Sequence, residues 1–271
     1  MTETLPQPAE KPATPPEALP FVAPCRELPA LAPLGWLSRG WADYRAAPGA
    51  SLAYGLLIVL LSWLVTGIGL AWGSYWSALV LLSGFVFVAP LLALGLYGVS
   101  RQLHEGNAST PPSLAGSLLS VQRSFGTVMV FAVALLVLFL IWARSASLVH
   151  VFFPAQGSAN LAEMALFLGI GTAVGAVFCL LTFVFSAFSL PMICDRDADA
   201  VTAIVTSVNA VLRNKPAMAV WAGLIVLLTA AGFATALIGL AVVIPVLGYA
   251  TWHGYRETID ASAWPRHSED N

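Results

Sequence analysis

Three carboxylates near the middle of the chain have a spacing that suggests metal chemistry. Asp195, Asp197 and Asp199 alternate along the sequence, as the first ligands of a calcium-binding loop do. Such a loop also needs a glycine directly after the third ligand and a glutamate at its twelfth position, where this chain has Ala200 and Thr206. We therefore interpret the carboxylates as groups that favour the N-terminus of a following helix, and we expect no metal site.

Other patterns that would indicate catalysis or a cofactor are incomplete. His104 and Glu105 are adjacent, but no second histidine follows at the spacing of a zinc-protease helix. The sequence contains no G-x-x-x-x-G-K-[ST] loop for phosphate, and the long apolar runs carry no histidine away from their ends that could ligate haem. We expect a protein that is not an enzyme and that holds no cofactor.

Three arginines have a repeated position that suits phosphate binding. Arg45, Arg123 and Arg213 each stand three residues before a proline or glycine and directly before a long apolar run. An arginine fork matches phosphate oxygens, so these residues are candidates for contact with lipid head groups, together with Arg101 and Arg256. The alternative is that they only set membrane orientation or cap helix ends.

Prolines inside apolar runs form a second repeated feature. Pro90 precedes Arg101 by eleven residues, and Pro245 precedes Arg256 by the same distance. Pro191 lies inside a third run and is followed by Arg196. Because proline removes a helical hydrogen bond, we predict helix kinks at Pro90, Pro191 and Pro245.

The composition places these residues in a membrane protein. The chain is 58% hydrophobic and only 10% charged, with a mean hydropathy of +0.82, whereas soluble domains are about 25% charged. We predict an all-α polytopic bundle of six transmembrane helices within residues 31–260, since about 20 apolar residues cross a bilayer. The expected spans are residues 51–72, 77–100, 127–143, 162–191, 217–232 and 235–252, with the last turn near 231–234.

The six spans group into three hairpins. Each hairpin follows a segment with one apolar helical face, which we expect to lie along the membrane surface. The return helix of each hairpin contains one of the three prolines. Gly171 and Gly175, in the fourth span, form a small-xxx-small pair that permits close helix contact. Residues 1–30 hold eight prolines and are predicted to be disordered, and residues 261–271 form a polar tail.

Positive charge predicts the orientation of this bundle. With six spans, eight basic residues near helix ends face the same side as both termini, and Arg144 alone faces the other. The eight are Arg39, Arg45, Arg101, Arg123, Arg196, Arg213, Lys215 and Arg256. Basic residues in short loops stay in the cytoplasm, so we expect a multi-pass inner-membrane protein with cytoplasmic N- and C-termini.

Several short motifs resemble a known family. They are Arg39-Gly40-Trp41-x-Asp43, Pro48-Gly49 before the first span, and the stretch from Pro90 to Tyr97 with Ser100-Arg101 after it. The chain resembles, over roughly residues 34–260, a bacterial family of predicted integral membrane proteins filed as a domain of unknown function. The resemblance implies a six-helix inner-membrane protein and supplies no activity.

Two functions fit a membrane protein without catalytic groups. The first is a non-enzymatic scaffold, assembly partner or lipid-organising module, whose partners would be membrane lipids and other membrane proteins but not nucleic acid. The second is a carrier or pore for a small neutral or apolar solute, since proline-broken helices at repeated positions are typical of transporters. A dry, packed bundle would favour the first function, and a hydrated cavity would favour the second.

Overall fold

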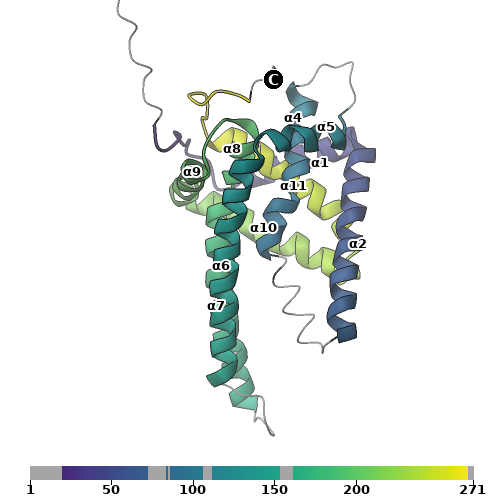
Figure 1. The fold of residues 1–271 in the computed structure, drawn as a ribbon, viewed down its shortest axis with the longest axis vertical. Coiled ribbons are helices and arrows are strands. Elements are labelled where there is room, and N and C mark those ends of the chain that lie inside the picture. The colour runs from purple at the N-terminus through teal and green to yellow at the C-terminus, as the bar shows by residue number, and fades with distance from the viewer. Residues whose placement is uncertain (1–19, 73–83, 85, 106–111, 153–160, 268–271) are drawn as a thin grey trace, which may run out of the picture.

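The computed structural model describes residues 20–72, 84, 86–105, 112–152 and 161–267 (Figure 1). These residues are almost entirely helical, and the pairing of Cys25 with Ile259 and of Arg196 with Arg266 forms two isolated β-bridges. The expected all-α fold is confirmed. The helices are α1 (Ala32–Ala46), α2 (Pro48–Trp72), α4 (Leu94–Glu105), α5 (Leu114–Arg123), α6 (Phe125–Phe152), α7 (Leu161–Ser186), α8 (Ser189–Asp195), α9 (Ala200–Arg213), α10 (Lys215–Ala234) and α11 (Leu240–Thr258).

The order of the helices repeats three times. In each repeat, a single residue separates a short helix (α1, α5 or α9) from a long helix (α2, α6 or α10), and a return helix follows. Single residues form the three corners, namely Ala47, Ser124 and Asn214. Proline at the start of α2 and near the start of α10 favours these corners, because it fits the first turn of a helix but not its interior.

Five helical stretches of the described residues are long and apolar enough to cross a membrane. They are Pro48–Ala71, Val86–Glu105, Phe125–Leu148, Ala165–Asp195 and Lys215–Ala234. The expected count of six is not confirmed, because α11 is not among them. The C-terminal half of α11 carries His253, Arg256 and Glu257, which lower its hydropathy.

Helix α11 lies at the centre of the bundle. It packs against α1, α2, α4 and α10, and most of its residues are buried (Figure 1). Glycines bring the neighbouring backbones close. A Cβ atom on Gly40 of α1 would lie 2.6 Å from the carbonyl oxygen of Val246, and one on Gly55 of α2 would overlap the carbonyl of Ala241. Ala241 is four residues before Pro245, so its carbonyl lacks a helical N–H partner, and Gly55 leaves room for it.

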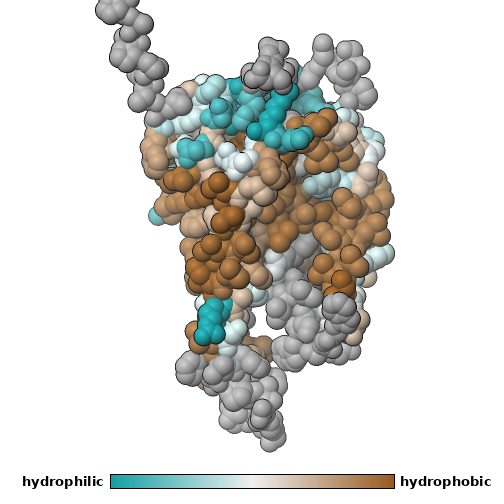
Figure 2. Space-filling view, in the orientation of Figure 1, coloured by the Kyte–Doolittle hydropathy of each residue, from teal (hydrophilic) through white to brown (hydrophobic). Residues whose placement is uncertain are grey.

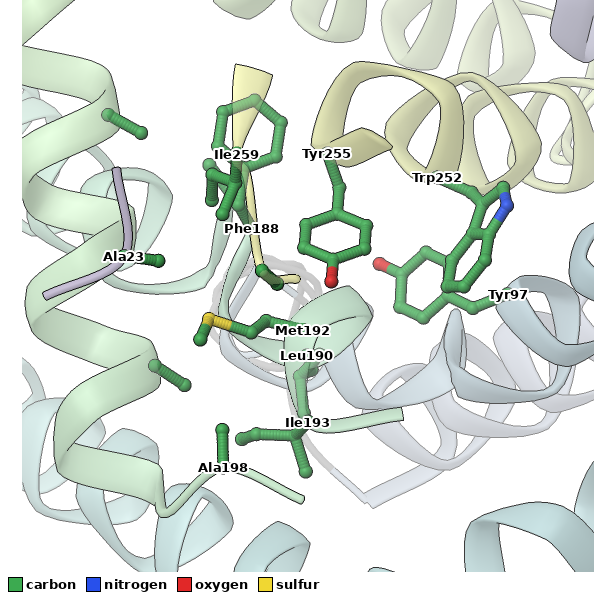
Figure 3. Close-up of a cluster of buried hydrophobic side chains, with 14 of the residues drawn as sticks. Ala23, Tyr97, Phe188, Leu190, Met192, Ile193, Ala198, Trp252, Tyr255 and Ile259 are labelled. Carbon is green, nitrogen blue, oxygen red and sulfur yellow. The ribbon is translucent and has the colours of Figure 1, made fainter. Parts of the chain in front are cut away.

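The largest core cluster joins α11 to α1, α8, α9 and α10. Tyr255 and Trp252 of α11 lie beside Tyr97 and above Leu190 and Met192 (Figure 3). In the same cluster, the ring of Trp36 in α1 meets the rings of Phe188 and Trp221 edge-on, with centroids 6.1 and 5.6 Å away. Such aromatic pairs add roughly 0.5–1.5 kcal/mol each beyond burial.

The surface divides into a polar end and an apolar flank. Figure 2 shows hydrophilic residues gathered at the end formed by α1, α5, α8 and the adjoining ends of α4 and α11, and hydrophobic residues along α2, α6 and α7. We call the hydrophilic region formed by these helix ends the polar end. The exposed apolar residues include Leu57, Leu60, Val130, Leu140 and Leu180. Apolar side chains on so much surface require an apolar solvent, which agrees with a bundle that lies in a membrane.

Both ends of the described chain are more ordered than the sequence suggests. Residues 22–28, which we expected within the disordered tail, are held by backbone bonds. Arg26 N–H donates to the carbonyl of Thr258, and Asp260 N–H donates to that of Pro24. At the other end, Trp264 is buried. Residues 1–19 lie outside the described residues. The last turn also differs, since it comprises residues 235–239 and not 231–234.

Candidate functional site at the polar end

Asp43 is the centre of a polar cluster at the polar end. Its Oδ1 lies 2.9 Å from Nε2 of His104, and its Oδ2 lies 2.9 Å from Nε2 of His253. Ser100 Oγ donates to Oδ2 at 2.6 Å. The two imidazole rings meet edge-on with centroids 5.0 Å apart. The carboxylate is therefore held between two histidines that come from different helices.

Three helices position these side chains. Asp43 lies in the last turn of α1, Ser100 and His104 lie four residues apart on α4, and His253 lies in the second half of α11. Residues four apart share a helix face, so Ser100 and His104 both point toward Asp43. The close contact at Gly40, three residues before Asp43, brings α1 against α11 and sets the approach of His253.

Burial and hydrogen bonding act in opposite directions on Asp43. Only 6% of its side chain is exposed, and burial alone would raise the pKa of the carboxyl group. Hydrogen bonds from His253, Ser100 and His104 outweigh this effect and lower the pKa of Asp43 below its ordinary value. The carboxylate is thus a stable anion at neutral pH. His253 is nearly as buried, whereas half of the His104 side chain is exposed.

The oxygen and nitrogen atoms of this cluster are close enough to share one metal ion. One ligand atom from each of Asp43, His104 and His253 falls within 4.8 Å of the others. Two imidazoles and a carboxylate form a donor set that proteins use for divalent transition metals. No metal motif is visible in the sequence, because the three residues belong to helices that are far apart in the chain. The available signal was that His104 and His253 both lie at the ends of predicted return helices.

Ion pairs surround the cluster. Arg39 of α1 donates to Glu257 of α11, and Arg256 donates to Glu105 of α4. Arg266 also reaches Glu105, at 3.2 Å. All of these side chains are partly exposed, so each pair contributes little stability alone. Together they connect α1, α4 and α11.

The predicted role of Asp195, Asp197 and Asp199 at a helix N-terminus is partly confirmed. Asp199 is the N-cap of α9, and its side chain accepts hydrogen bonds from the N–H groups of Val201 and Thr202, both at 2.9 Å. Asp195 instead is buried, where it accepts a 2.8 Å hydrogen bond from the Tyr255 hydroxyl and contacts Arg196. These contacts are structural and connect α8, α9 and α11.

The three candidate head-group arginines occupy matching positions. Arg45, Arg123 and Arg213 each lie in the last turn of the short helix of a repeat, next to a corner residue. Arg213 is exposed and pairs with Glu27 at 3.2 Å. The other two candidates contact neighbouring elements, since Arg256 pairs with Glu105 and Arg101 donates to the carbonyl of Cys194 at 3.2 Å.

The three prolines have different local surroundings. After Pro90 the helix is interrupted at Ala93, whose N–H donates to the carbonyl of Pro90 at 3.2 Å. Pro191 lies inside α8, and the break between α7 and α8 comes at residues 187–188, just before it. Pro245 lies within the uninterrupted helix α11.

A second feature is an apolar groove on the flank of the bundle. It is a cavity of about 290 Å³ between α6, α7 and the start of the second span. Its walls are almost wholly apolar. Gly171 and Gly175 form part of them, and a Cβ atom on either glycine would meet nothing within 4 Å. These glycines therefore hollow the surface of α7 where the sequence suggested a close helix contact. The lining residues are Val86, Phe87, Trp142, Ala146, Phe167, Gly171, Val174, Gly175, Phe178 and Cys179.

The comparison with protein families agrees with this architecture. Residues 78–195 match the family described as "Predicted integral membrane protein (DUF2189)". The expected family resemblance is confirmed. The matched region includes the Pro90 and Arg101 motif and the groove, but it is shorter than the 34–260 expected and leaves out Asp43 and His253. Comparisons with curated proteins and with solved structures found no match.

Proposed function

We propose that this integral membrane protein is a non-enzymatic, lipid-organising module of the inner membrane. The observation that carries the proposal is the apolar groove between α6, α7 and residues 86–87. All three walls belong to helical stretches that are apolar enough to cross a membrane. The groove is therefore open at a depth where the surrounding solvent is lipid hydrocarbon.

An acyl chain is the occupant that fits this groove. Two of the lining rings, Phe87 and Trp142, pack against each other and against Phe139 behind them, with centroids 5.4–5.7 Å apart, which gives that part of the wall a fixed shape. The wall formed by α7 is shallow at Gly171 and Gly175, which carry no side chain. A flexible hydrocarbon chain can follow such a surface without leaving any polar group unsatisfied.

Basic residues at the ends of the short helices would contact the lipid head groups. Arg45, Arg123 and Arg213 recur at the same place in three repeats, and one basic residue near an anionic leaflet contributes about 1 kcal/mol. Changing all three to glutamine should lower the anionic lipid that copurifies with the protein. Lys215, Arg101 and Arg256 would remain and keep the charge bias that sets the orientation. Unchanged lipid retention would mean that these arginines only set membrane orientation or cap helix ends.

The groove itself is tested by filling it. Gly171→Leu should displace bound lipid, which native mass spectrometry of the protein in mild detergent measures as the fraction of lipid-bound ions. Gly169→Leu is the matched control, because Gly169 lies on the same helix, has equal space around it and does not line the groove. Equal lipid occupancy in the two variants would overturn the acyl-chain proposal.

A carrier for a small neutral or apolar solute is the second candidate. The interruption of the second span at Ala93 favours it, since broken helices often lie at transport sites. The Tyr54 hydroxyl donates to the carbonyl of Leu92 beside this break. A hydrogen bond from a neighbouring helix also stabilises an ordinary proline kink, so this contact agrees with either function. Solute uptake into proteoliposomes that is lost when Tyr54 is changed to Phe would favour the carrier.

A further inference from the structure

The Asp43 cluster has no part in the proposed lipid function and calls for an explanation of its own. An aspartate with 6% of its side chain exposed sits between two histidines, at the junction of the first and last repeats. We propose that Asp43, His104 and His253 form a binding site for a divalent transition-metal ion of the Zn²⁺ class. This site would connect α1, α4 and α11 at the polar end.

The donor set is the first argument for this class of ion. Imidazole nitrogens favour zinc, copper, iron and nickel, whereas calcium and magnesium sites are built from oxygen ligands. Two histidines and one carboxylate are also the protein ligands of zinc sites that keep a fourth position for water. The carboxylate supplies one negative charge, and the neutral imidazoles bind through Nε2 while they carry their protons on Nδ1.

The present distances are compatible with such an ion. Nitrogen and oxygen ligands at about 2.0–2.1 Å from a tetrahedral zinc lie roughly 3.4 Å from one another. The two Asp43–histidine separations are 2.9 Å, and all three ligand atoms fall within 4.8 Å. To bind the ion, the two 2.9 Å pairs would have to separate by about 0.5 Å, and a pair at the 4.8 Å limit would have to close by about 1.4 Å. Rotation of the histidine and aspartate side chains can supply such movements. The backbone contact of α1 with α11 at Gly40 would remain unchanged.

The surroundings provide support for a ligand and access from water. Ser100 donates to Oδ2 of Asp43 at 2.6 Å and orients the carboxylate, as outer hydrogen bonds do for metal ligands in general. His104 is half exposed, so an ion can reach the cluster from the aqueous side. His253 and Asp43 lie deeper and would hold the ion on the protein side.

Hydrogen bonds alone offer a competing explanation. Each imidazole can donate Nε2–H to one carboxylate oxygen, and the cluster would then be a metal-free contact between helices. The two explanations differ in stoichiometric metal binding. They also differ in the expected effect of removing His104. If the cluster is only hydrogen-bonded, the loss of one half-exposed donor should hardly change the fold. If the cluster binds a metal ion, the loss of one of its three ligands should abolish tight metal binding.

The experiment uses the full chain, purified in detergent through an affinity tag without histidines and stripped with a chelator. Zn²⁺ titration should give one bound ion per chain, and Co²⁺ should give the visible absorption of a low-symmetry, nitrogen-liganded site. His104→Ala, His253→Ala and Asp43→Asn should each weaken binding by more than about 100-fold, which exceeds the loss seen when only an outer partner is removed.

His267→Ala is the matched control. His267 is also a histidine at the polar end, but it contacts Ser124 and the carbonyl of Ile193 instead of Asp43. This variant should bind Zn²⁺ like the unchanged protein. Size-exclusion chromatography tests whether lost binding reflects misfolding, because His104→Ala should elute at the same volume as the unchanged protein. No stoichiometric binding, or equal binding in His104→Ala and His267→Ala, would overturn the metal site and leave the hydrogen-bonded contact.

Discussion

Single residues at the polar end fix where helices begin and how they meet. Asp199 is the clearest example, because it satisfies two N–H groups that α9 would otherwise leave unpaired. This role was predictable from the sequence, since an aspartate before an apolar helical face is a common N-cap. The neighbouring Asp195 was not predictable in the same way, because its partner Tyr255 is 60 residues away along the chain.

We predict that Asp199→Ala destabilises the protein by about 1 kcal/mol, whereas Asp199→Asn, which can still accept both bonds, changes stability much less. Partial burial of Asp199 opposes ionisation, but hydrogen bonds from Thr202 and Val201 lower its pKa below 3.8. The cap is therefore fully effective above pH 3.8 and is lost as the pH falls through the lowered value. Thermal unfolding in detergent at pH 7 should separate the two variants, and the wild-type advantage over Asp199→Ala should shrink in acid.

Helices pair in this bundle through glycines whose packing role is not visible in the sequence. Gly171 and Gly175 form a recognisable small-residue pair, yet they line a groove. The close contacts come instead from Gly40 and Gly55, against the backbone of α11. The periodicity of α1 predicts an amphipathic helix but contains no information about its partner, because α11 is about 200 residues away. The same separation hides the cluster of Asp43 with His253, a pair 210 residues apart.

At the level of helices, Gly40→Ala should separate α1 from α11. The new Cβ atom would lie 2.6 Å from the Val246 carbonyl oxygen and 2.7 Å from the Ala250 nitrogen, both of which are backbone atoms that cannot rotate away. Overpacking of this kind costs about 1–3 kcal/mol. The matched control is Gly35→Ala on the same helix, where nothing lies within 4 Å and the higher helix propensity of alanine should stabilise slightly. Denaturation midpoints in detergent measure both effects, and equal midpoints would contradict the proposed contact.

The arrangement of the whole molecule constrains how often the chain crosses the membrane. Cys25 pairs with Ile259, and Arg26 donates to the carbonyl of Thr258, so the segments before α1 and after α11 lie side by side. Asn214, at the start of α10, also bonds to Arg26 and Leu28. The hairpin of α10 and α11 therefore leaves and returns to the same end. The number of crossings between residues 26 and 258 must then be even, although only five stretches meet the criteria of length and apolarity.

We predict from this that α11 completes the sixth crossing and that both described chain ends lie in the cytoplasm, where the basic residues near helix ends also gather. A reporter enzyme that is active only outside the cytoplasm should be silent when fused after Ser262, and a cytoplasmic reporter at the same place should be active. Truncation after Phe233, inside α10 and before the turn, should reverse both signals, because α10 alone would leave the fused reporter on the far side. If the truncation leaves the signals unchanged, α10 and α11 form a hairpin that enters and leaves the membrane on one side, and the bundle has four full crossings.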